Sequence, residues 1–390
     1  FAKLRASYAE TGGSLNPYEL YNTYSIGKEP NGNTTASRNS TLYNSDVLSE
    51  LLKSFEVGFD IKAFNRVSLD VAYYKTNATN QLIRLSMNPL SGYQNYMANA
   101  GNIQNQGIEA VLGINVLNNP DRLLWDINVN YSKNVNELLD LTEDLRVYSL
   151  GGFDNVQISS TVGQRYGTIY GTKFATVEDP NSPHFGKRIV NGDGLPLASG
   201  PHLLGDQSAR ALLGINNSFA YKNFGLSFLI DGRFGGKFFA GTNLALQRAG
   251  LAEETVMNGS RDPFVVDAVV SDGSGGYTVN TKQVTPQQYW NQVTNTSGNL
   301  GITEQNLYDA TNIRLRNVQL SYRIPAKVLN NSVVKSARFS LSANNLWMIK
   351  SHANGVDPES VYAISTNAVG FEYLSFPTSR SYFLNISLGF

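Results

Sequence analysis

The 390-residue sequence predicts an all-β fold of antiparallel strands that cross a membrane, and three observations support this prediction. Apolar and polar residues alternate along most of the chain, which is the period of two-sided strands. The connections between the alternating segments are either very short or very long. Charged residues make up only 16% of the chain, below the roughly 25% of typical soluble domains, while Tyr, Phe and Gly are frequent.

The alternation defines ten segments that are long enough to be spanning strands. Their opposite faces are polar or small, as with Ser68 and Asp70 in one segment and Asp126 and Asn128 in another. The apolar positions fall within residues 4–8, 55–61, 67–73, 108–116, 123–131, 213–221, 224–230, 318–322, 339–343 and 382–390.

The connections distinguish a membrane barrel from a soluble antiparallel sandwich, which shows the same alternation. Outer-membrane barrels have short turns on the periplasmic side and long loops outside, and structureless loops beyond about 15 residues are uncommon in compact soluble domains. The layout therefore favours the barrel. Short connections are expected at 63–66, 118–122 and 222–223, a moderate one at 325–335, and long ones at 10–51, 77–106, 135–209, 234–310 and 348–378.

Residues 166–177 also alternate, but a spanning strand there would put the 222–223 turn on the wrong side of the membrane. We therefore assign 166–177 to β structure inside a long loop. Ten strands leave two open edges, which lipid does not tolerate, so further strands are expected to close the barrel. The sequence also begins without Met and within a strand pattern, so we interpret it as a piece of a longer protein.

Three local signals refine the strands and loops. The apolar phase slips within 315–318, which predicts a β-bulge, and Pro325 ends that strand where a lost hydrogen-bond donor costs little. A small hairpin is expected to turn at 272–276. A helix is expected to start with Thr285 as N-cap and Pro286 as its first residue.

Composition and motifs argue against nucleic-acid binding and against catalysis. Lys plus Arg and Asp plus Glu are balanced at 31 each, and the chain has no Cys. Standard hydrolase, zinc-protease and nucleotide-binding motifs are absent from the sequence, and its three histidines, at positions 184, 202 and 352, are far apart. Acidic pairs at 143–144 and 253–254 lie in polar loops and are expected at the solvated surface. We therefore do not expect an enzyme or an organic cofactor.

One stretch raises the possibility of a metal site. Asn191-Gly-Asp-Gly194 is similar to part of a calcium loop, because alternating oxygen side chains and Gly suit a hard cation, and Asp193 would be the ligand. The stretch lacks the upstream Asp and the closing Glu of such loops. A plain turn is the alternative.

Aromatic residues of the long loops are candidates for substrate contact. A ring supplies apolar area for stacking, and neighbouring amides can bond hydroxyl or peptide groups of a sugar or peptide. At strand ends the alternative is the aromatic girdle at the membrane interface. The loop candidates are Tyr166, Tyr170, Phe238, Tyr289 and Trp290.

The last twelve residues, SRSYFLNISLGF, form a bare alternating strand. The residues expected to face lipid are Tyr382, Leu384, Ile386 and Leu388, and those expected to face the lumen are Ser381, Asn385, Ser387 and Gly389. Phe383 falls on the lumen side and is the exception to the pattern. Phe390 ends the chain and is expected at the periplasmic rim.

Six segments together carry a family resemblance. They are KSFEVGFD at 53–60, NAGNIQNQGIE at 99–109, GQRYGTIYG at 163–171, RLRNVQLSY at 314–322, NNL at 344–346 with DPE at 357–359, and FPTSR at 376–380. In this order they resemble signatures of the SusC/RagA-type TonB-linked outer-membrane proteins of Bacteroidetes. The resemblance covers nearly all of the chain.

The resemblance implies that residues 1–390 are the C-terminal part of a 22-stranded outer-membrane barrel, roughly its last ten strands. The family's signal peptide, carboxypeptidase-like extension, TonB-interacting segment and plug would then lie outside this sequence. Such proteins import oligosaccharides or peptides, with a SusD-like surface lipoprotein as lid and energy relayed by TonB. The terminal strand with Tyr382, Leu384, Ile386, Leu388 and Phe390 would be the signal for the barrel-assembly machinery. A siderophore or cobalamin receptor, a surface adhesin and a barrel-associated enzyme are the alternatives.

Overall fold

The computed structural model describes residues 1–119, 122–142, 145–257, 259–295, 299–330, 332–353, 355–362 and 365–390. The acidic pair at 143–144 therefore lies outside the described residues. The chain divides into two compact units, each described by itself. Unit 1 comprises residues 1–112, 132–148 and 160–166, and unit 2 comprises residues 113–131, 149–159 and 167–390.

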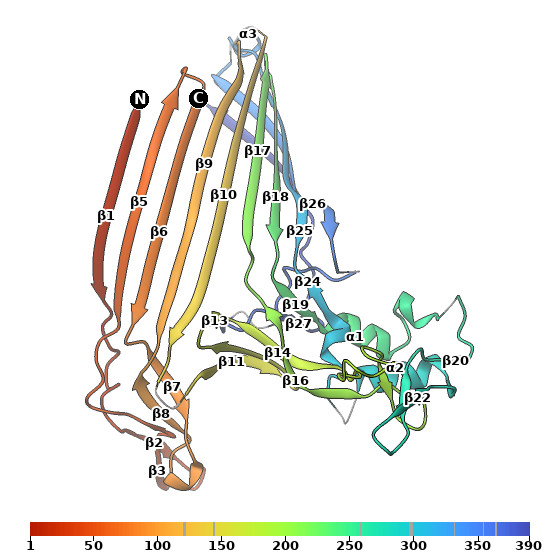
Figure 1. The fold of residues 1–390 in the computed structure, drawn as a ribbon. Coiled ribbons are helices and arrows are strands. Elements are labelled where there is room, and N and C mark those ends of the chain that lie inside the picture. Colours follow the sequence, from red (N-terminus) through yellow and green to blue (C-terminus); the bar gives the residue numbers. More distant parts are fainter. Residues whose placement is uncertain are drawn as a thin grey trace. The chain divides into compact units, whose positions relative to one another are not determined.

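The main sheet contains ten long strands that are hydrogen-bonded to one another in chain order (Figure 1). They are β1 (Ala2–Gly12), β5 (Leu51–Ala63), β6 (Val67–Thr79), β9 (Asn102–Asn118), β10 (Leu123–Asp140), β17 (Ala211–Tyr221), β18 (Phe224–Phe234), β25 (Asn312–Arg323), β26 (Ser336–Ser351) and β28 (Ser381–Gly389). A short strand, β13 (Gln164–Arg165), adds to β10. The ten predicted strands and their order are confirmed.

Tight turns join the strands at one end. Phe64 and Asn65 connect β5 to β6 with φ values of 53° and 52°, which matches the two-residue turns that fit the twist of hairpins. Lys222, with φ 52°, turns β17 into β18. The short helix α3 (Ala326–Leu329) lies between β25 and β26, at the opposite end of these strands from α1 and α2 (Figure 1). The short connections at 63–66 and 222–223 are therefore where the sequence predicted them, whereas the predicted connections at 118–122 and 325–335 lie partly outside the described residues.

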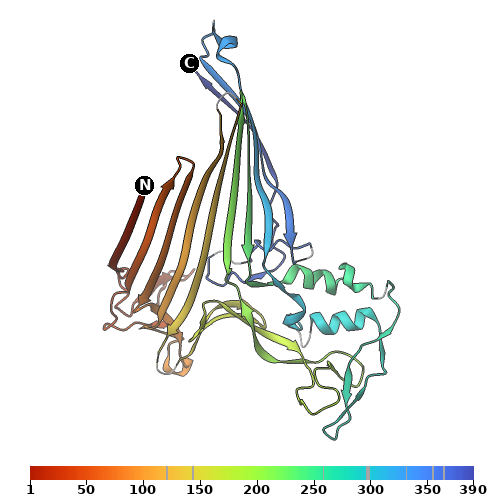
Figure 2. The same cartoon turned by 45° about the horizontal axis from the view of Figure 1, so that its top comes forward.

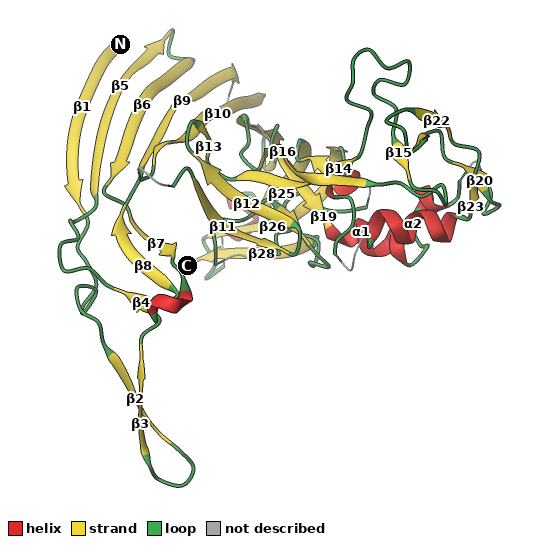
Figure 3. Ribbon diagram, turned by 60° about the horizontal axis from the view of Figure 1, so that its bottom comes forward, coloured by secondary structure: helices red, strands yellow, loops and turns green. Residues whose placement is uncertain are grey.

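The long connections of unit 1 are folded. The hairpin of β2 (Tyr24–Lys28) and β3 (Thr34–Arg38) is exposed along its whole length and projects from the rest of the unit (Figure 3). A second sheet combines β4 (Thr41–Leu42), β8 (Asn95–Asn99) and β7 (Leu82–Ser86), with the 3₁₀ turn η1 (Pro89–Ser91) between β7 and β8. A small core of Ala100, Leu138 and Leu141 packs against Ile83, Ile103, Tyr148 and Val162.

In the described residues, the long connections of unit 2 form four small sheets and two helices (Figure 2). The strands β11 (Val147–Phe153), β12 (Val156–Thr161), β14 (Thr168–Phe174) and β16 (Ala198–Asp206) form one sheet, so the predicted β structure at 166–177 is confirmed. The others are β15 (Ile189–Val190) with β21 (Val269–Ser271) and β22 (Tyr277–Val279); β24 (Leu307–Asp309) with β19 (Lys237–Ala240) and β27 (Phe371–Glu372); and the pair β20 (Phe264–Val265) and β23 (Gln283–Val284). The helices are α1 (Gly241–Arg248) and α2 (Pro286–Thr294), with 3₁₀ turns η2 (Glu253–Thr255) and η4 (Thr303–Asn306).

The predicted hairpin and helix are both present. β21 and β22 pair across the 272–276 turn, where the Asp272 carboxylate accepts the N–H groups of Ser274 and Gly276. In α2 the Thr285 hydroxyl accepts the Gln288 N–H, and the Gln288 side chain accepts the Thr285 N–H. This reciprocal capping box satisfies two donors that a helix start leaves free.

The predicted bulge is also confirmed. Leu315 pairs with Ile230 and Asn317 pairs with Leu229, so Arg316 is an extra residue in β25 opposite an uninterrupted β18. The partner strand β26 shifts register at the same point, between Asn344 and Trp347. A bulge re-aims the side chain of its extra residue, which here is an arginine.

Compact apolar cores lie in the loops rather than in the main sheet. One core of unit 2 surrounds α2, and a second surrounds α1 and β12. Apolar residues on the alternating face of the long strands are exposed, as with Leu384 at 69%. No helix in the described ranges is long and apolar enough to cross a membrane.

Candidate functional site

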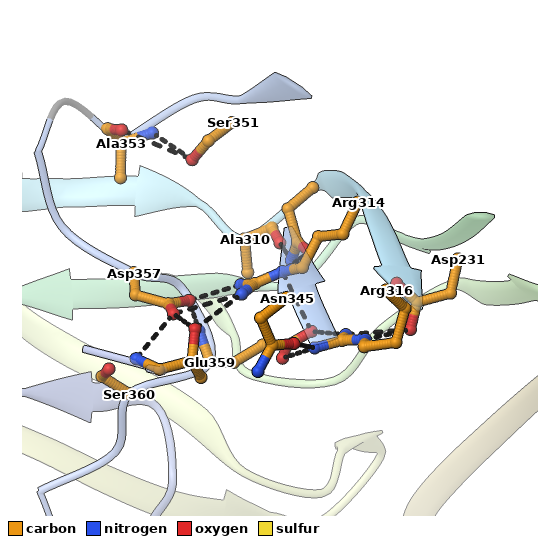
Figure 4. A network of polar contacts seen from close by, with 12 residues as sticks. Asp231, Ala310, Arg314, Arg316, Asn345, Ser351, Ala353, Asp357, Glu359 and Ser360 are labelled. Carbon is orange, nitrogen blue, oxygen red and sulfur yellow. Dashed lines mark hydrogen bonds and ion pairs between the residues drawn. The ribbon is translucent and has the colours of Figure 1, made fainter. Parts of the chain in front are cut away.

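Charged side chains from three long strands and one loop meet at the loop end of unit 2 (Figure 4). We call this set the arginine cluster: Arg314 and Arg316 from β25, Asp231 from β18, Asn345 from β26, and Asp357 and Glu359 from the connection between β26 and β28. All members except Asp231 lie within the motif segments 314–322, 344–346 and 357–359.

Arg314 and Asp357 form a buried ion pair, with side chains 3% and 7% exposed. Arg314 donates through both terminal nitrogens, one to Asp357 Oδ2 at 3.1 Å and the other to Oδ1. The Glu359 N–H donates to Asp357 Oδ1 at 2.9 Å, and Thr378 donates both its N–H, at 3.2 Å, and its hydroxyl to Oδ2. Burial alone would raise the pKa of Asp357, but the donors from Arg314, Thr378 and Glu359 outweigh it and hold the pKa well below its usual range.

Arg316 joins two strands to the same connection. Its Nε donates to Asp231 Oδ2 at 2.9 Å, and its terminal nitrogens donate to both carboxylate oxygens of Glu359 at 3.0 and 2.8 Å. One of those nitrogens also donates to Asn345 Oδ1 at 3.1 Å. Because Arg316 is the extra residue of the bulge, the break in alternation is what brings its guanidinium to these carboxylates.

Two further contacts anchor the connection between β26 and β28. The Gln207 side chain donates to the Asn367 carbonyl at 2.7 Å and accepts the Val369 N–H at 3.0 Å. Glu372, only 1% exposed, accepts the Thr242 N–H at 3.1 Å and its hydroxyl in the first turn of α1. A carboxylate is favourable there because the start of a helix carries a partial positive charge.

The arrangement supports binding and positioning rather than covalent chemistry. Every carboxylate of the arginine cluster is engaged by a guanidinium. In the described residues no group of three His, Cys, Asp or Glu side chains could hold a metal ion. A cavity of about 410 Å³ adjoins the cluster, lined among others by Arg314, Asp357, Thr378 and Arg380. This volume falls in the range of small-molecule sites.

The aromatic candidates occupy different environments. Phe238, Tyr289 and Trp290 are buried in loop cores, where the Tyr289 and Trp290 rings meet edge to face at 5.3 Å between centroids. Tyr170 is half-buried in unit 2, and Tyr166 is half-buried in unit 1. The three buried rings already use their faces in packing, so stacking by these residues on a sugar or peptide stays a prediction.

Asp193 lies in an exposed turn. The Asn191 side-chain oxygen accepts the N–H groups of Asp193 at 3.0 Å and of Leu195 at 2.9 Å, and Gly194 has φ 82°. These contacts are those of a turn closed by an Asn side chain. Calcium binding at Asp193 stays a prediction.

The register of the last strand supports the predicted facing of its residues. Tyr382, Leu384 and Ile386 pair with Ala343, Leu341 and Phe339, and directly paired residues share one face of a sheet. Phe383 pairs with Ser342 on the opposite face, as the alternation predicted. The role of Tyr382, Leu384, Ile386, Leu388 and Phe390 as an assembly signal stays a prediction.

Sequence reasoning did not identify the arginine cluster as a site, although it quoted the segments that contain it. A usable signal was present. Two arginines at alternate positions, 314 and 316, are matched by two acids at alternate positions, 357 and 359, in the motif segment that follows. Each arginine pairs with the acid at the corresponding position.

Comparison with known proteins adds whole-chain similarities. No protein-family model matches the chain. Over its full length it is 24% identical to TonB-dependent receptor P3 and 27% identical to TonB-dependent receptor P26, both of Formosa agariphila. A solved structure of the RagAB peptide transporter aligns with 99% of the chain at a TM-score of 0.71 and 20% identity, and the 'open-open' state of the RagAB peptide importer at 0.68. The chain spans 39% and 40% of the two receptors and 40% of the RagAB chain.

Proposed function

We propose that the chain is part of the barrel of a SusC/RagA-type TonB-dependent receptor of the bacterial outer membrane and that the whole protein imports oligosaccharides or peptides. The observation that carries the proposal is the ten-strand sheet with tight turns at one end and folded loops at the other. The similar proteins are named as receptors and transporters, which agrees with a role other than catalysis.

The folded loops support binding of a nutrient. Loops with their own buried cores hold side chains in fixed positions, which a specific binding site requires and a disordered loop does not provide. The arginine cluster anchors the last connection to β18, β25 and β26, so this connection forms part of a rigid wall. Selectivity would come from side chains at loop cavities, and no bond in the nutrient needs to be broken.

The partners follow from the same family assignment. We propose that a SusD-like surface lipoprotein covers the loops and that the TonB complex supplies energy through parts of the protein outside this sequence. RagAB is described as a peptide transporter, which makes peptides one substrate class to test, with oligosaccharides as the other.

Deletion of the gene, with uptake measured for peptides and for oligosaccharides, tests the proposal. Import of one class should be lost, should return on complementation, and should also be lost when TonB is inactivated. Purification of the intact protein from outer membranes, followed by mass spectrometry, should recover a lipoprotein partner. Unchanged uptake together with loss of surface attachment would instead indicate the adhesin alternative.

A further inference from the structure

A second cavity in unit 2, of about 380 Å³, is lined by residues at the end of α1 and at the start of α2. Its volume is within the range of small-ligand sites. The lining includes Gln247 and Arg248 at the end of α1, Thr255 in η2, Arg261, and Thr285 and Trp290 of the α2 region.

Two guanidinium groups of this cavity have no acidic partner. Arg248 donates to the carbonyl of Thr294, and Arg261 donates to the carbonyl of Gly250 at 2.8 Å. Neither forms an ion pair with any residue that the structure describes. Both side chains are exposed, so the cavity opens to solvent, and each guanidinium keeps further N–H groups to donate.

The carboxylate of Glu254 is bonded to a lining residue, Gln247, rather than to either arginine. Glu254 Oε1 accepts Gln247 Nε2 at 2.7 Å and Asn243 Nδ2 at 3.3 Å. Asn306 completes this buried network by donating to Gln247 Oε1 at 2.7 Å. The polar network therefore orders the back of the cavity without neutralising the two arginines.

The opposite wall is the start of α2, formed by Thr285, Pro286 and Gln287. The Thr285 N–H is bonded to the Gln288 side chain and Pro286 has no N–H, so Gln287 supplies the backbone donor of this wall, at a helix end that carries partial positive charge. Trp290 is 5% exposed, and its indole N–H is buried with no acceptor among the described residues. Two guanidinium groups, a helix start and an indole donor together favour an acceptor with negative charge.

We propose that this cavity binds a carboxylate group of the imported nutrient. This inference rests on the proposed import function and specifies its substrate chemistry. The carboxylate has two sources, the uronic acid of an oligosaccharide and the C-terminal carboxylate of a peptide. A guanidinium binds either one through paired N–H donors, which gives charge-assisted hydrogen bonds.

The experiment measures binding to the intact protein, purified from outer membranes, with two matched pairs of probes. One pair is cellobiouronic acid and cellobiose, and the other is trialanine and its C-terminal amide. The acidic member of one pair should bind about tenfold or more tightly than its neutral partner, since charged hydrogen bonds are roughly twice as strong as neutral ones. The pair that shows this preference identifies the source of the carboxylate.

Variants test whether the preference arises in this cavity. Arg248→Gln and Arg261→Gln should each weaken binding of the acidic probe about tenfold and the double variant should abolish the preference. Gln287→Glu adds a negative charge in the first turn of α2. This charge stabilises the helix, so the variant should fold, but it should repel the acidic probe and weaken its binding. Arg323→Gln, at the turn end of β25, is the matched control and should leave binding unchanged.

Three results would overturn the inference: no binding of either acidic probe, equal binding of acidic and neutral probes, or a preference that survives in the double variant. Uptake separates this failure from failure of the proposed function. If gene deletion abolishes nutrient uptake and one of these three results is also obtained, the carboxylate site is refuted while the proposed import function is still supported.

Discussion

The Arg314 and Asp357 side chains are so deeply buried that neither charge can be solvated if the other is lost. We therefore predict that Asp357→Asn lowers the free energy of unfolding by about 3 kcal/mol, near the lower end of the usual cost of leaving one buried charge unpaired, because Glu359 Oε1 still lies 3.5 Å from Arg314 Nε. Limited proteolysis of the connection at residues 352–378 measures the effect. The paired change Arg314→Met with Asp357→Leu should cost much less, because it removes both charges. Equal losses in the single and paired variants would contradict this account.

The Asp357 carboxylate also makes the stability of the connection at residues 352–378 depend on pH. The pKa of Asp357 is lower in the folded protein than in the unfolded chain, so its ion pair contributes full stability above the unfolded value of about 3.9. That contribution is lost as the pH falls through the folded pKa. Protease resistance of residues 352–378 should therefore stay constant from pH 8 to about 5 and decline only in stronger acid. In Asp357→Asn this acid-dependent decline should be absent.

The environment of single residues was the part of the site that the sequence did not predict. The aromatic residues of the loops were interpreted as ligand contacts because of their chemistry, which stays a prediction, whereas the burial of Phe238, Tyr289 and Trp290 in cores was not foreseen. A loop residue's burial depends on partners that are remote in sequence: Trp290 packs in one core with Phe174 and Val190. Local composition does not contain that information.

Among the elements, α2 has the most complete local specification. Thr285→Ala should remove the capping box and destabilise the helix by about 1 kcal/mol, whereas Thr285→Ser keeps a hydroxyl and should behave like the native protein. Hydrogen exchange of the backbone amides of residues 287–294 is the measurement. Unchanged exchange in Thr285→Ala would mean that packing of the buried residues Tyr289, Trp290 and Val293 fixes the helix by itself.

Elements with strong local signals were predictable from the sequence. Alternation gave the long strands, Thr285 and Pro286 gave the start of α2, and the phase slip within 315–318 gave the bulge. The sequence did not predict that Arg316 would reach Asp231 and Glu359, because a slip in phase reports an extra residue but not the direction of its side chain. Short strands such as β19 and β27 were also missed, since a few residues carry no measurable period.

At the scale of the whole molecule, the last strand tests membrane assembly. If Phe390 is part of the assembly signal, Phe390→Ala should reduce the amount of protein in the outer membrane several-fold, as measured by membrane fractionation and immunoblotting. Phe383→Ser is the matched control, because Phe383 lies on the face that pairs with Ser342 and should tolerate a polar residue. Equal amounts of both variants in the membrane would argue against a signal at Phe390.

The contacts of Gln207 and Glu372 also determine when the protein can finish folding. Gln207 bonds residues 160 and 162 positions away, and Glu372 caps a helix 130 positions before it. Contacts between distant positions form late, because the chain must first lose the entropy of closing a long loop. The core around Phe239 and Leu244 includes Phe371, so it stays open until the chain has been synthesised as far as Phe371. During that interval the apolar residues of this core are exposed. This is therefore the stage of folding at which chaperones and proteases compete for the protein.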